Sequence, residues 1–169
     1  MAMDIYILRH GLAVELDDPD CRRDAERQLT GEGKRKLEHV ADALQAMEIS
    51  FDLILTSPYK RASQTAEIIA EAFGLKKKIQ CTGCLEPGAS PRELIEFING
   101  LKSSPENLLL VGHEPDLSRL TSLLVGGDFN VAITLKKGGF VRVKCEQLEH
   151  GQCGSLEWLL TPAHMLLMA

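Results

Sequence analysis

The chain has 169 residues, a formal net charge of −5 and 44% hydrophobic residues. A chain of this length buries roughly two-thirds of its unfolded surface without a disulfide or a structural metal, so we expect a single domain over residues 1–169. The negative charge offers no basic field to nucleic acid, and Asp4 and Arg9 interrupt any signal-like apolar run. We therefore expect a cytoplasmic protein that binds neither nucleic acid nor membrane.

The first predicted element is an apolar strand over residues 5–8, and it ends abruptly in Arg9-His10-Gly11. The polar, acidic residues 12–28 form a predicted loop of a length usually reserved for function, and we expect part of it to cover or flank a site. Thr30 is a good N-cap for an amphipathic helix, because apolar residues recur at helical spacing from Leu37 to Met47.

A second strand is predicted over residues 51–56. Ser57-Pro58 follows it, and this pair is typical of a helix start, with serine as the cap and proline at the first helical position. Arg61 is then expected in the opening turns of a helix that ends at Gly74.

Residues 78–81 predict a weak third strand, and residues 85–88 predict a turn. Ser90-Pro91-Arg92-Glu93 indicates a capping box at the start of another helix. The apolar run 107–111 is typical of a strand buried on both faces, and a helix is expected to begin after His113. The alternating residues 141–145 and 156–160 predict a β-hairpin at one sheet edge.

Strands that alternate with helices predict a three-layer α/β/α sandwich with a mainly parallel central sheet and right-handed crossovers. In such sheets, ligands bind outside the carboxyl ends of the strands. We therefore expect polar residues from four strand ends to converge on one anionic ligand: Arg9, His10, Ser57, Arg61, Glu86 and His113.

This set of residues favours a phosphoryl group as the ligand. Two arginines can hold it by paired charge-assisted hydrogen bonds, and helices that start near Ser57 and Glu114 add their positive ends. A histidine among such groups should have its imidazolium form disfavoured, which keeps a ring nitrogen of His10 free as a nucleophile. His113 would donate to the equatorial oxygens during transfer.

Each residue also has a structural interpretation when taken singly. Arg9 could form a salt bridge, His10 or His113 could be a polar residue at the sheet rim, and Arg61 could be an exposed helical arginine. Glu86 beside Pro-Gly could be a solvated turn residue.

A metal site is the chemical alternative, with His10, His113 and Glu86 as ligands, but two adjacent arginines would repel a divalent cation.

The remaining histidines and the C-x-x-C pair are expected to play no part in the chemistry. His39, His150 and His164 lack partners of the kind described, so we assign them surface or packing roles. Cys81 and Cys84 lie between strand-like residues and a turn rather than at a helix start, so we interpret them as structural or incidental.

Three ordered motifs resemble the histidine phosphatase superfamily, also called phosphoglycerate mutase-like: residues 8–11, 56–66 and 111–115. Within it, the chain is similar to the SixA-type phosphohistidine phosphatases, and this resemblance rests on residues 28–33, 85–91, 136–139 and 158–162.

The resemblance implies a covalent phosphohistidine at His10 and a phosphate pocket of Arg9, Arg61 and His113, with hydrolysis by water in a second step. It implies no metal or organic cofactor. The acid is left open, because the SixA-type pattern tolerates other residues where larger members place a glutamate. Glu86 is the candidate for protonating the leaving group, and its rivals are Asp17, Asp18 and Glu114.

Superfamily enzymes that act on small phosphates often carry a helical insertion over the site. Here about twenty residues separate Gly88 from Leu108, and one helix accounts for them. We therefore expect an open pocket without a helical lid, which suits phosphohistidine on a partner protein of a phosphorelay or phosphocarrier system. The alternatives are a phosphatase of small phosphate esters and a non-catalytic module that binds phosphorylated partners.

Overall fold

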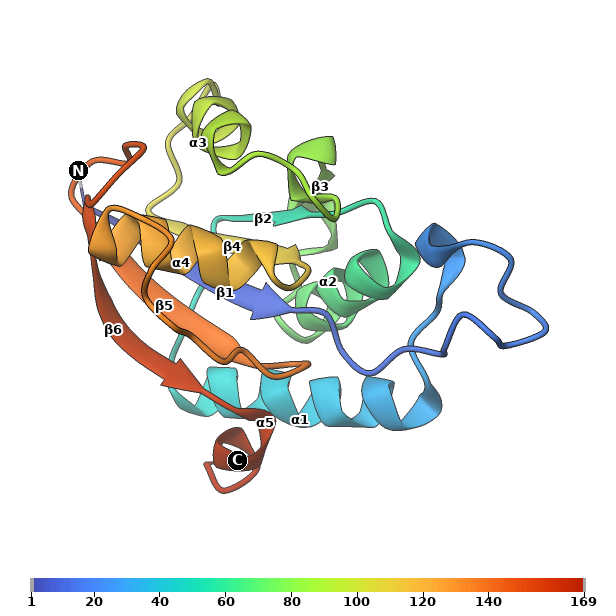
Figure 1. The fold of residues 1–169 in the computed structure, drawn as a ribbon. Helices are drawn as coiled ribbons and strands as arrows, with labels where there is room; N and C mark the ends of the chain where they lie inside the picture. The colour runs from blue at the N-terminus through green and yellow to red at the C-terminus, as the bar shows by residue number, and fades with distance from the viewer. Residues whose placement is uncertain (1, 169) are drawn as a thin grey trace.

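A six-stranded mixed sheet forms the centre of the computed structural model, which describes residues 2–168 (Figure 1). Its strands are β1 (Met3–Arg9), β2 (Leu53–Thr56), β3 (Ile79–Cys81), β4 (Asn107–Gly112), β5 (Phe140–Cys145) and β6 (Gly154–Leu160). They lie in the order β3-β2-β4-β1-β5-β6. β1 to β4 run parallel, whereas β5 and β6 form an antiparallel hairpin at one edge, as the alternating sequence led us to expect.

Helices cover both faces of the sheet, which confirms the three-layer α/β/α prediction. They are α1 (Gly31–Ala46), α2 (Lys60–Ala72), α3 (Pro91–Asn99), α4 (Asp116–Gly126) and α5 (Pro162–Met165), with short 3-10 helices η1 (Asp24–Glu26), η2 (Lys76–Lys78) and η3 (Gly83–Leu85). Across residues 2–168 we find no helix long and apolar enough to cross a membrane.

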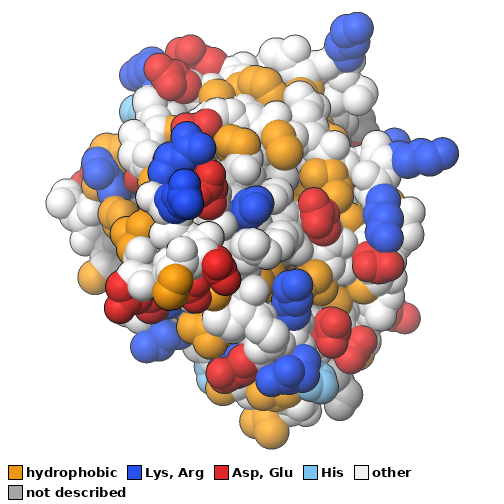
Figure 2. Space-filling model, turned by 90° about the vertical axis from the view of Figure 1, so that its right-hand side faces the viewer, with side chains coloured by type: hydrophobic (Ala, Val, Ile, Leu, Met, Phe, Trp, Pro, Cys, Tyr) orange, Lys and Arg blue, Asp and Glu red, His pale blue; other side chains and the backbone are white. Residues whose placement is uncertain are grey.

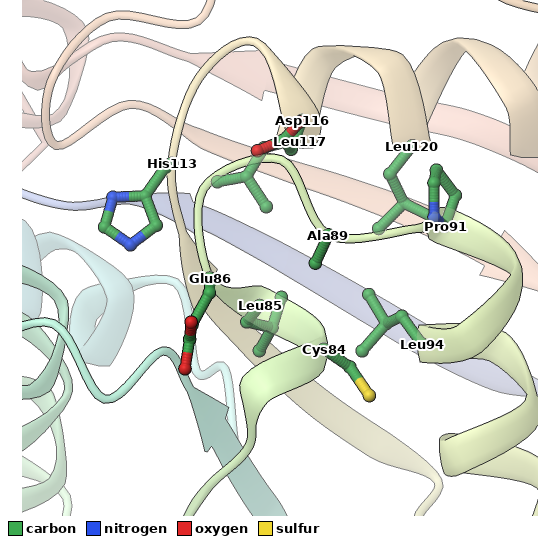
Figure 3. Close-up of a pocket in the computed structure, with 10 residues that line it drawn as sticks. All are labelled: Cys84, Leu85, Glu86, Ala89, Pro91, Leu94, His113, Asp116, Leu117 and Leu120. Carbon is green, nitrogen blue, oxygen red and sulfur yellow. The ribbon is translucent and has the colours of Figure 1, made fainter.

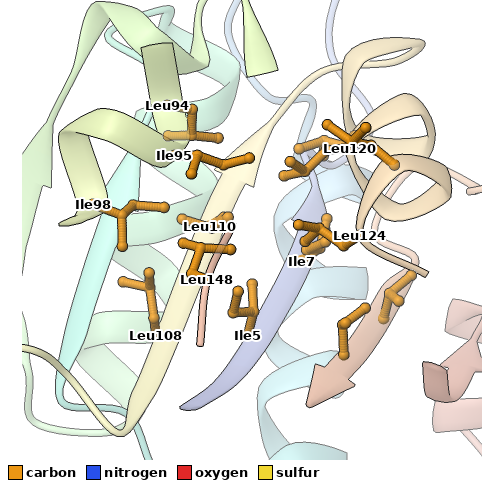
Figure 4. Packing of buried hydrophobic residues seen from close by; sticks show 14 of the residues in the cluster. Ile5, Ile7, Leu94, Ile95, Ile98, Leu108, Leu110, Leu120, Leu124 and Leu148 are labelled. Atoms are coloured by element: carbon orange, nitrogen blue, oxygen red, sulfur yellow. The ribbon is translucent and has the colours of Figure 1, made fainter. Parts of the chain in front are cut away.

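The core consists of two apolar clusters separated by the sheet. Ile5 and Ile7 of β1 face α3 and α4, and Figure 4 shows this cluster. Tyr6 and Leu8 face the opposite way and pack with α1, α2 and α5. Because successive strand residues point to opposite faces, a strand buried on both sides must be apolar throughout.

The parallel register aligns the strand ends. Arg9 lies beside Gly112, and Thr56 lies beside both Val111 and Cys81. The segments that follow β1, β2, β3 and β4 therefore leave the sheet at the same edge.

The start of α1 fixes the segment after His10. Thr30 is the N-cap, as predicted, and its Oγ1 accepts a hydrogen bond from the Gly33 N–H at 2.9 Å. The Thr30 N–H donates to the Leu12 carbonyl at 2.9 Å. A Cβ on Gly33 would lie 2.2 Å from that same carbonyl oxygen, so only glycine permits this approach.

The expected cap of α2 is wrong, and that of α3 is confirmed in position but not in its hydrogen bond. α2 begins at Lys60 with Tyr59 at the N-cap position, so Pro58 precedes the helix. Ser57 does not cap it, because its Oγ lies 2.9 Å from Nε2 of His113 and, among residues 2–168, accepts only the Tyr59 N–H, at 3.2 Å. α3 does begin at Pro91, but among the described residues the Ser90 side chain makes no capping hydrogen bond.

We predict that Gly33→Ala lowers the free energy of unfolding by about 2 kcal/mol or more, because the added methyl group meets a backbone oxygen. Gly31→Ala is the matched control, since its Cβ would be 3.6 Å from the flexible end of Arg35. That change should be neutral or slightly stabilising. Urea denaturation of both variants measures the difference, and equal stabilities would contradict the close-packing argument.

Candidate active site

His10 lies directly after β1 and is 5% exposed. Its Nδ1 is 2.8 Å from the Gly11 carbonyl oxygen. A carbonyl only accepts, so this hydrogen bond requires the proton on Nδ1 and leaves the lone pair on Nε2. The backbone N–H of His10 donates to the Gly112 carbonyl at 3.1 Å, which holds the residue against the end of β4.

Arg61 comes from the first turn of α2 and is 4% exposed. Its Nε is 3.3 Å from Nε2 of His10, so a guanidinium N–H faces the ring nitrogen that bears the lone pair. Its two terminal nitrogens donate to Asp24, one to the backbone carbonyl at 2.7 Å and one to Oδ2 at 2.9 Å.

His113 follows β4, and the centroid of its ring is 5.2 Å from that of His10. Its Nε2 is 2.9 Å from the Ser57 hydroxyl. Its Nδ1 is buried, and within residues 2–168 it has no hydrogen-bond partner. A hydroxyl that donates to Nε2 leaves Nδ1 as the N–H donor of the ring.

Arg9 reaches the site from the last residue of β1. One terminal nitrogen donates to the Leu135 carbonyl at 2.9 Å, and its buried Nε lacks a partner among the described residues. The turn before β5 holds its backbone, because Gly138, at φ +74°, donates to the Arg9 carbonyl at 3.0 Å. In the described part of the chain, the two buried side-chain nitrogens without partners, on Arg9 and His113, are thus both at this site.

Electrostatics keep both imidazoles neutral. Burial lowers the pKa of His10 to about 3, with smaller contributions from His113 and Arg61, although the Gly11 hydrogen bond opposes the shift. Burial also lowers the pKa of His113 to about 4, and Arg61 adds to this. From the sequence we expected the disfavoured imidazolium but attributed it to the arginines, whereas burial is the larger cause.

Glu86 is half-buried and lines a small cavity together with His113. In Figure 3 the two side chains lie on one side of the cavity, and Leu94 and Leu120 lie on the other. The cavity holds about 20 Å³, which is room for one water-sized group.

Two of the other carboxylates considered as acids have local partners. Glu114 accepts hydrogen bonds from the N–H and the hydroxyl of Ser118, so it satisfies the start of α4. Asp18 accepts the Asp20 N–H at 2.9 Å and closes a turn in the loop 12–28.

Three residues near the site were missed at the sequence level: Asp24, Arg27 and Thr65. Thr65 accepts the Gly11 N–H at 3.1 Å and donates to the Arg61 carbonyl at 2.6 Å, so it joins β1 to α2. Thr65 lies four residues after Arg61 in the predicted helix, and this spacing could have predicted its hydrogen bond to the Arg61 carbonyl. Asp24 and Arg27 lie in the loop 12–28, which does flank the site as expected, but nothing in the sequence separates Asp24 from the other loop aspartates.

The arrangement of possible metal-ligating side chains gives little support to the alternative of a metal site. In the part of the chain that the structure describes, no three His, Cys, Asp or Glu side chains are grouped to hold a metal ion. Cys81 and Cys84 are free thiols at the end of β3 and in η3.

Figure 2 views the molecule from the side on which β1, β2 and β4 end. Basic and acidic side chains are interspersed on this face with hydrophobic ones, so no single sign of charge dominates it.

Comparison with known proteins agrees with this geometry. The model of the histidine phosphatase superfamily (branch 1) matches residues 5–85, which include His10 and Arg61. The chain belongs to the histidine phosphatase superfamily. An uncharacterized protein of Picosynechococcus sp. is 36% identical over 143 residues, which are 84% of this chain and 85% of that protein.

Two further proteins are similar to this chain over almost its whole length. Phosphohistidine phosphatase SixA of Escherichia coli (strain K12) is 23% identical over 164 residues, 96% of each chain. The structure of the protein histidine phosphatase SixA complexed with tungstate has a TM-score of 0.75 and 24% identity, covering 95% of this chain and 98% of that one. The fold is therefore that of SixA, and the similarity supports a phosphatase activity.

We predict that His10 and His113 stay neutral between pH 8 and pH 5, because burial holds their pKa values near 3 and 4. NMR titration of the ring resonances checks this, with His10→Ala and His113→Ala variants for assignment. A midpoint near 6.5 for either ring would contradict it. The unfolded chain binds more protons over the range from about 6.5 down to about 4, so the free energy of unfolding should fall as pH drops through it.

Proposed function

We propose that this chain hydrolyses phosphohistidine on a partner protein through a covalent phosphohistidine at His10. The observation that supports this most directly is the state of the His10 ring. Its proton is held on Nδ1 by the Gly11 carbonyl, and its Nε2 faces a guanidinium N–H at 3.3 Å. A neutral imidazole whose Nε2 carries an unprotonated lone pair beside a cation is a nucleophile suited to an anionic phosphoryl group.

In the first step, Nε2 of His10 attacks phosphorus, and the phosphorus–nitrogen bond of the substrate breaks as the new one forms. Arg9, Arg61 and the Nδ1–H of His113 bind the phosphoryl oxygens, whose charge must be stabilised during transfer. Two buried side-chain nitrogens lack partners within residues 2–168, Arg9 Nε and His113 Nδ1, and they support this assignment.

Ser57 acts through His113 rather than on the phosphate. We had expected it among the phosphate-binding residues, but its hydroxyl is fully buried and is engaged by His113 and by the Tyr59 N–H. It orients the ring so that Nδ1 is the donating nitrogen.

The departing imidazole nitrogen keeps the electron pair of the broken bond and takes a proton. Glu86 is our candidate for the donor because it lines the same cavity as His113. Phosphohistidine needs little such help, since its phosphoramidate bond is labile once the ring is protonated. In the second step water attacks phosphorus, the bond to Nε2 breaks, and inorganic phosphate leaves.

A protein substrate fits the shape of the site. Only residues 86–90 connect η3 to α3, so no helical insertion stands over the strand ends between β3 and β4. The small cavity beside Glu86, of about 20 Å³, is lined by His113 but not by Arg9, His10 or Arg61, so it does not enclose the phosphoryl site. A phosphorylated side chain displayed by another protein, in a phosphorelay or phosphocarrier system of the cytoplasm, needs no such enclosure.

The test is a dephosphorylation panel of phosphohistidine proteins and small phosphate esters. We expect kcat/KM to be highest for a phosphohistidine protein and to fall by about a thousandfold or more in His10→Ala. His39→Ala is the control, because it removes an exposed histidine from α1 and should leave the rate unchanged.

Two other outcomes would overturn the proposal in different ways. Strong preference for one small ester, with indifference to phosphorylated proteins, would make the chain a small-molecule phosphatase. Tight binding of phosphorylated partners with no turnover of any substrate would make it a binding module.

A further inference from the structure

Asp24 occupies one side of the Arg61 guanidinium with two different acceptors. Its backbone carbonyl accepts from one terminal nitrogen at 2.7 Å, and its Oδ2 accepts from the other at 2.9 Å. The Arg61 side chain is 5% exposed, so these donors need protein partners. A single residue of the loop 12–28 provides both.

Arg27 holds the other carboxylate oxygen. Its Nη1 lies 3.1 Å from Oδ1 of Asp24, and its Nε donates to the Val14 carbonyl at 2.7 Å. The contacts therefore form a chain from Arg27 through Asp24 to Arg61 and on to Nε2 of His10. Arg27 also lies 3.7 Å from a carboxylate oxygen of Glu15, so two carboxylates face the two arginines, and Arg61 is the cation in contact with the nucleophile.

The contacts of Asp24 leave part of Arg61 free for a ligand. A guanidinium has five N–H bonds in a rigid plane. Asp24 uses one on each terminal nitrogen, and the Nε–H faces His10. The Tyr59 ring, 5.3 Å from the guanidinium carbon, lies against the group as well. The plane is thus fixed with its Nε edge toward Nε2 of His10.

The charge state of Asp24 suits a partner for arginine. Burial raises the pKa of this carboxyl, but hydrogen bonds from Arg61 and Arg27 outweigh burial and the net pKa is lowered. At neutral pH the group is a carboxylate with no proton to give. It is therefore poorly suited to serve as the acid for the leaving group.

We propose that Asp24 is a positioning residue, which holds Arg61 with its Nε–H toward Nε2 of His10 and thereby sets the affinity of the site for a phosphoryl group. The proposal rests on the proposed function and deepens it. It also gives the loop 12–28 a role, because this loop delivers Asp24 to the site.

Calorimetric titration with inorganic phosphate tests the proposal on the full chain. Asp24→Ala should weaken phosphate binding by about tenfold, since the guanidinium loses its side-chain anchor. Asp24→Asn keeps an oxygen acceptor and removes a negative charge, so it should bind within about threefold of the wild type or more tightly. Asp20→Ala is the matched control, because it removes an exposed aspartate from the same loop.

The proposal is overturned if the Asp24→Ala protein binds phosphate as tightly as the Asp20→Ala protein does, or more tightly than the wild type. A second measurement takes kcat/KM in an Arg61→Ala background, where Asp24→Ala should cause no further loss if it acts only through Arg61. A further loss as large as in the wild-type background would also overturn it.

Failure of the proposed function gives a separate result. A wild-type protein that binds phosphate but turns over no phosphorylated substrate would refute the phosphatase activity. The phosphate affinities of the Asp24 and Asp20 variants would still decide the role of Asp24.

Discussion

The hydrogen bond between Nδ1 of His10 and the Gly11 carbonyl determines which ring nitrogen is available for chemistry. It is made within one dipeptide, so it depends on how the chain leaves β1. The Gly11 N–H is held by Thr65, the His10 N–H by the Gly112 carbonyl, and the Arg9 carbonyl by the Gly138 N–H. These three contacts come from three different elements of the fold and fix one short segment.

Burial then lowers the pKa of His10, so Nε2 is unprotonated and can act as the nucleophile. An imidazole that is 5% exposed, with arginines nearby, loses its proton from Nε2 at any pH near neutrality. The same burial would be costly if the site were apolar, because the arginine N–H groups would lack acceptors. Here the Leu135 carbonyl accepts a hydrogen bond from Arg9, and the Asp24 carbonyl accepts one from Arg61.

Much of this arrangement could be predicted from the sequence, because it follows from topology. Apolar strands that alternate with helices give a parallel sheet, and the strand ends then bring Arg9, His10, Arg61 and His113 to one edge. The Thr30 cap was also predictable, because its interaction is local. The Ser57 cap was not, since the side chain hydrogen-bonds to His113 across 56 residues of sequence. Asp24 was missed for the same reason, as its partner lies 37 residues away on another element.

The most direct test of the account is to trap the phosphorylated protein during turnover and to map the phosphate. Rapid quenching under basic conditions, followed by peptide mapping, should place an acid-labile phosphate on Nε2 of His10 that disappears as inorganic phosphate is released. Phosphate on another residue, or wild-type turnover with no phosphorylated intermediate at His10, would contradict the account.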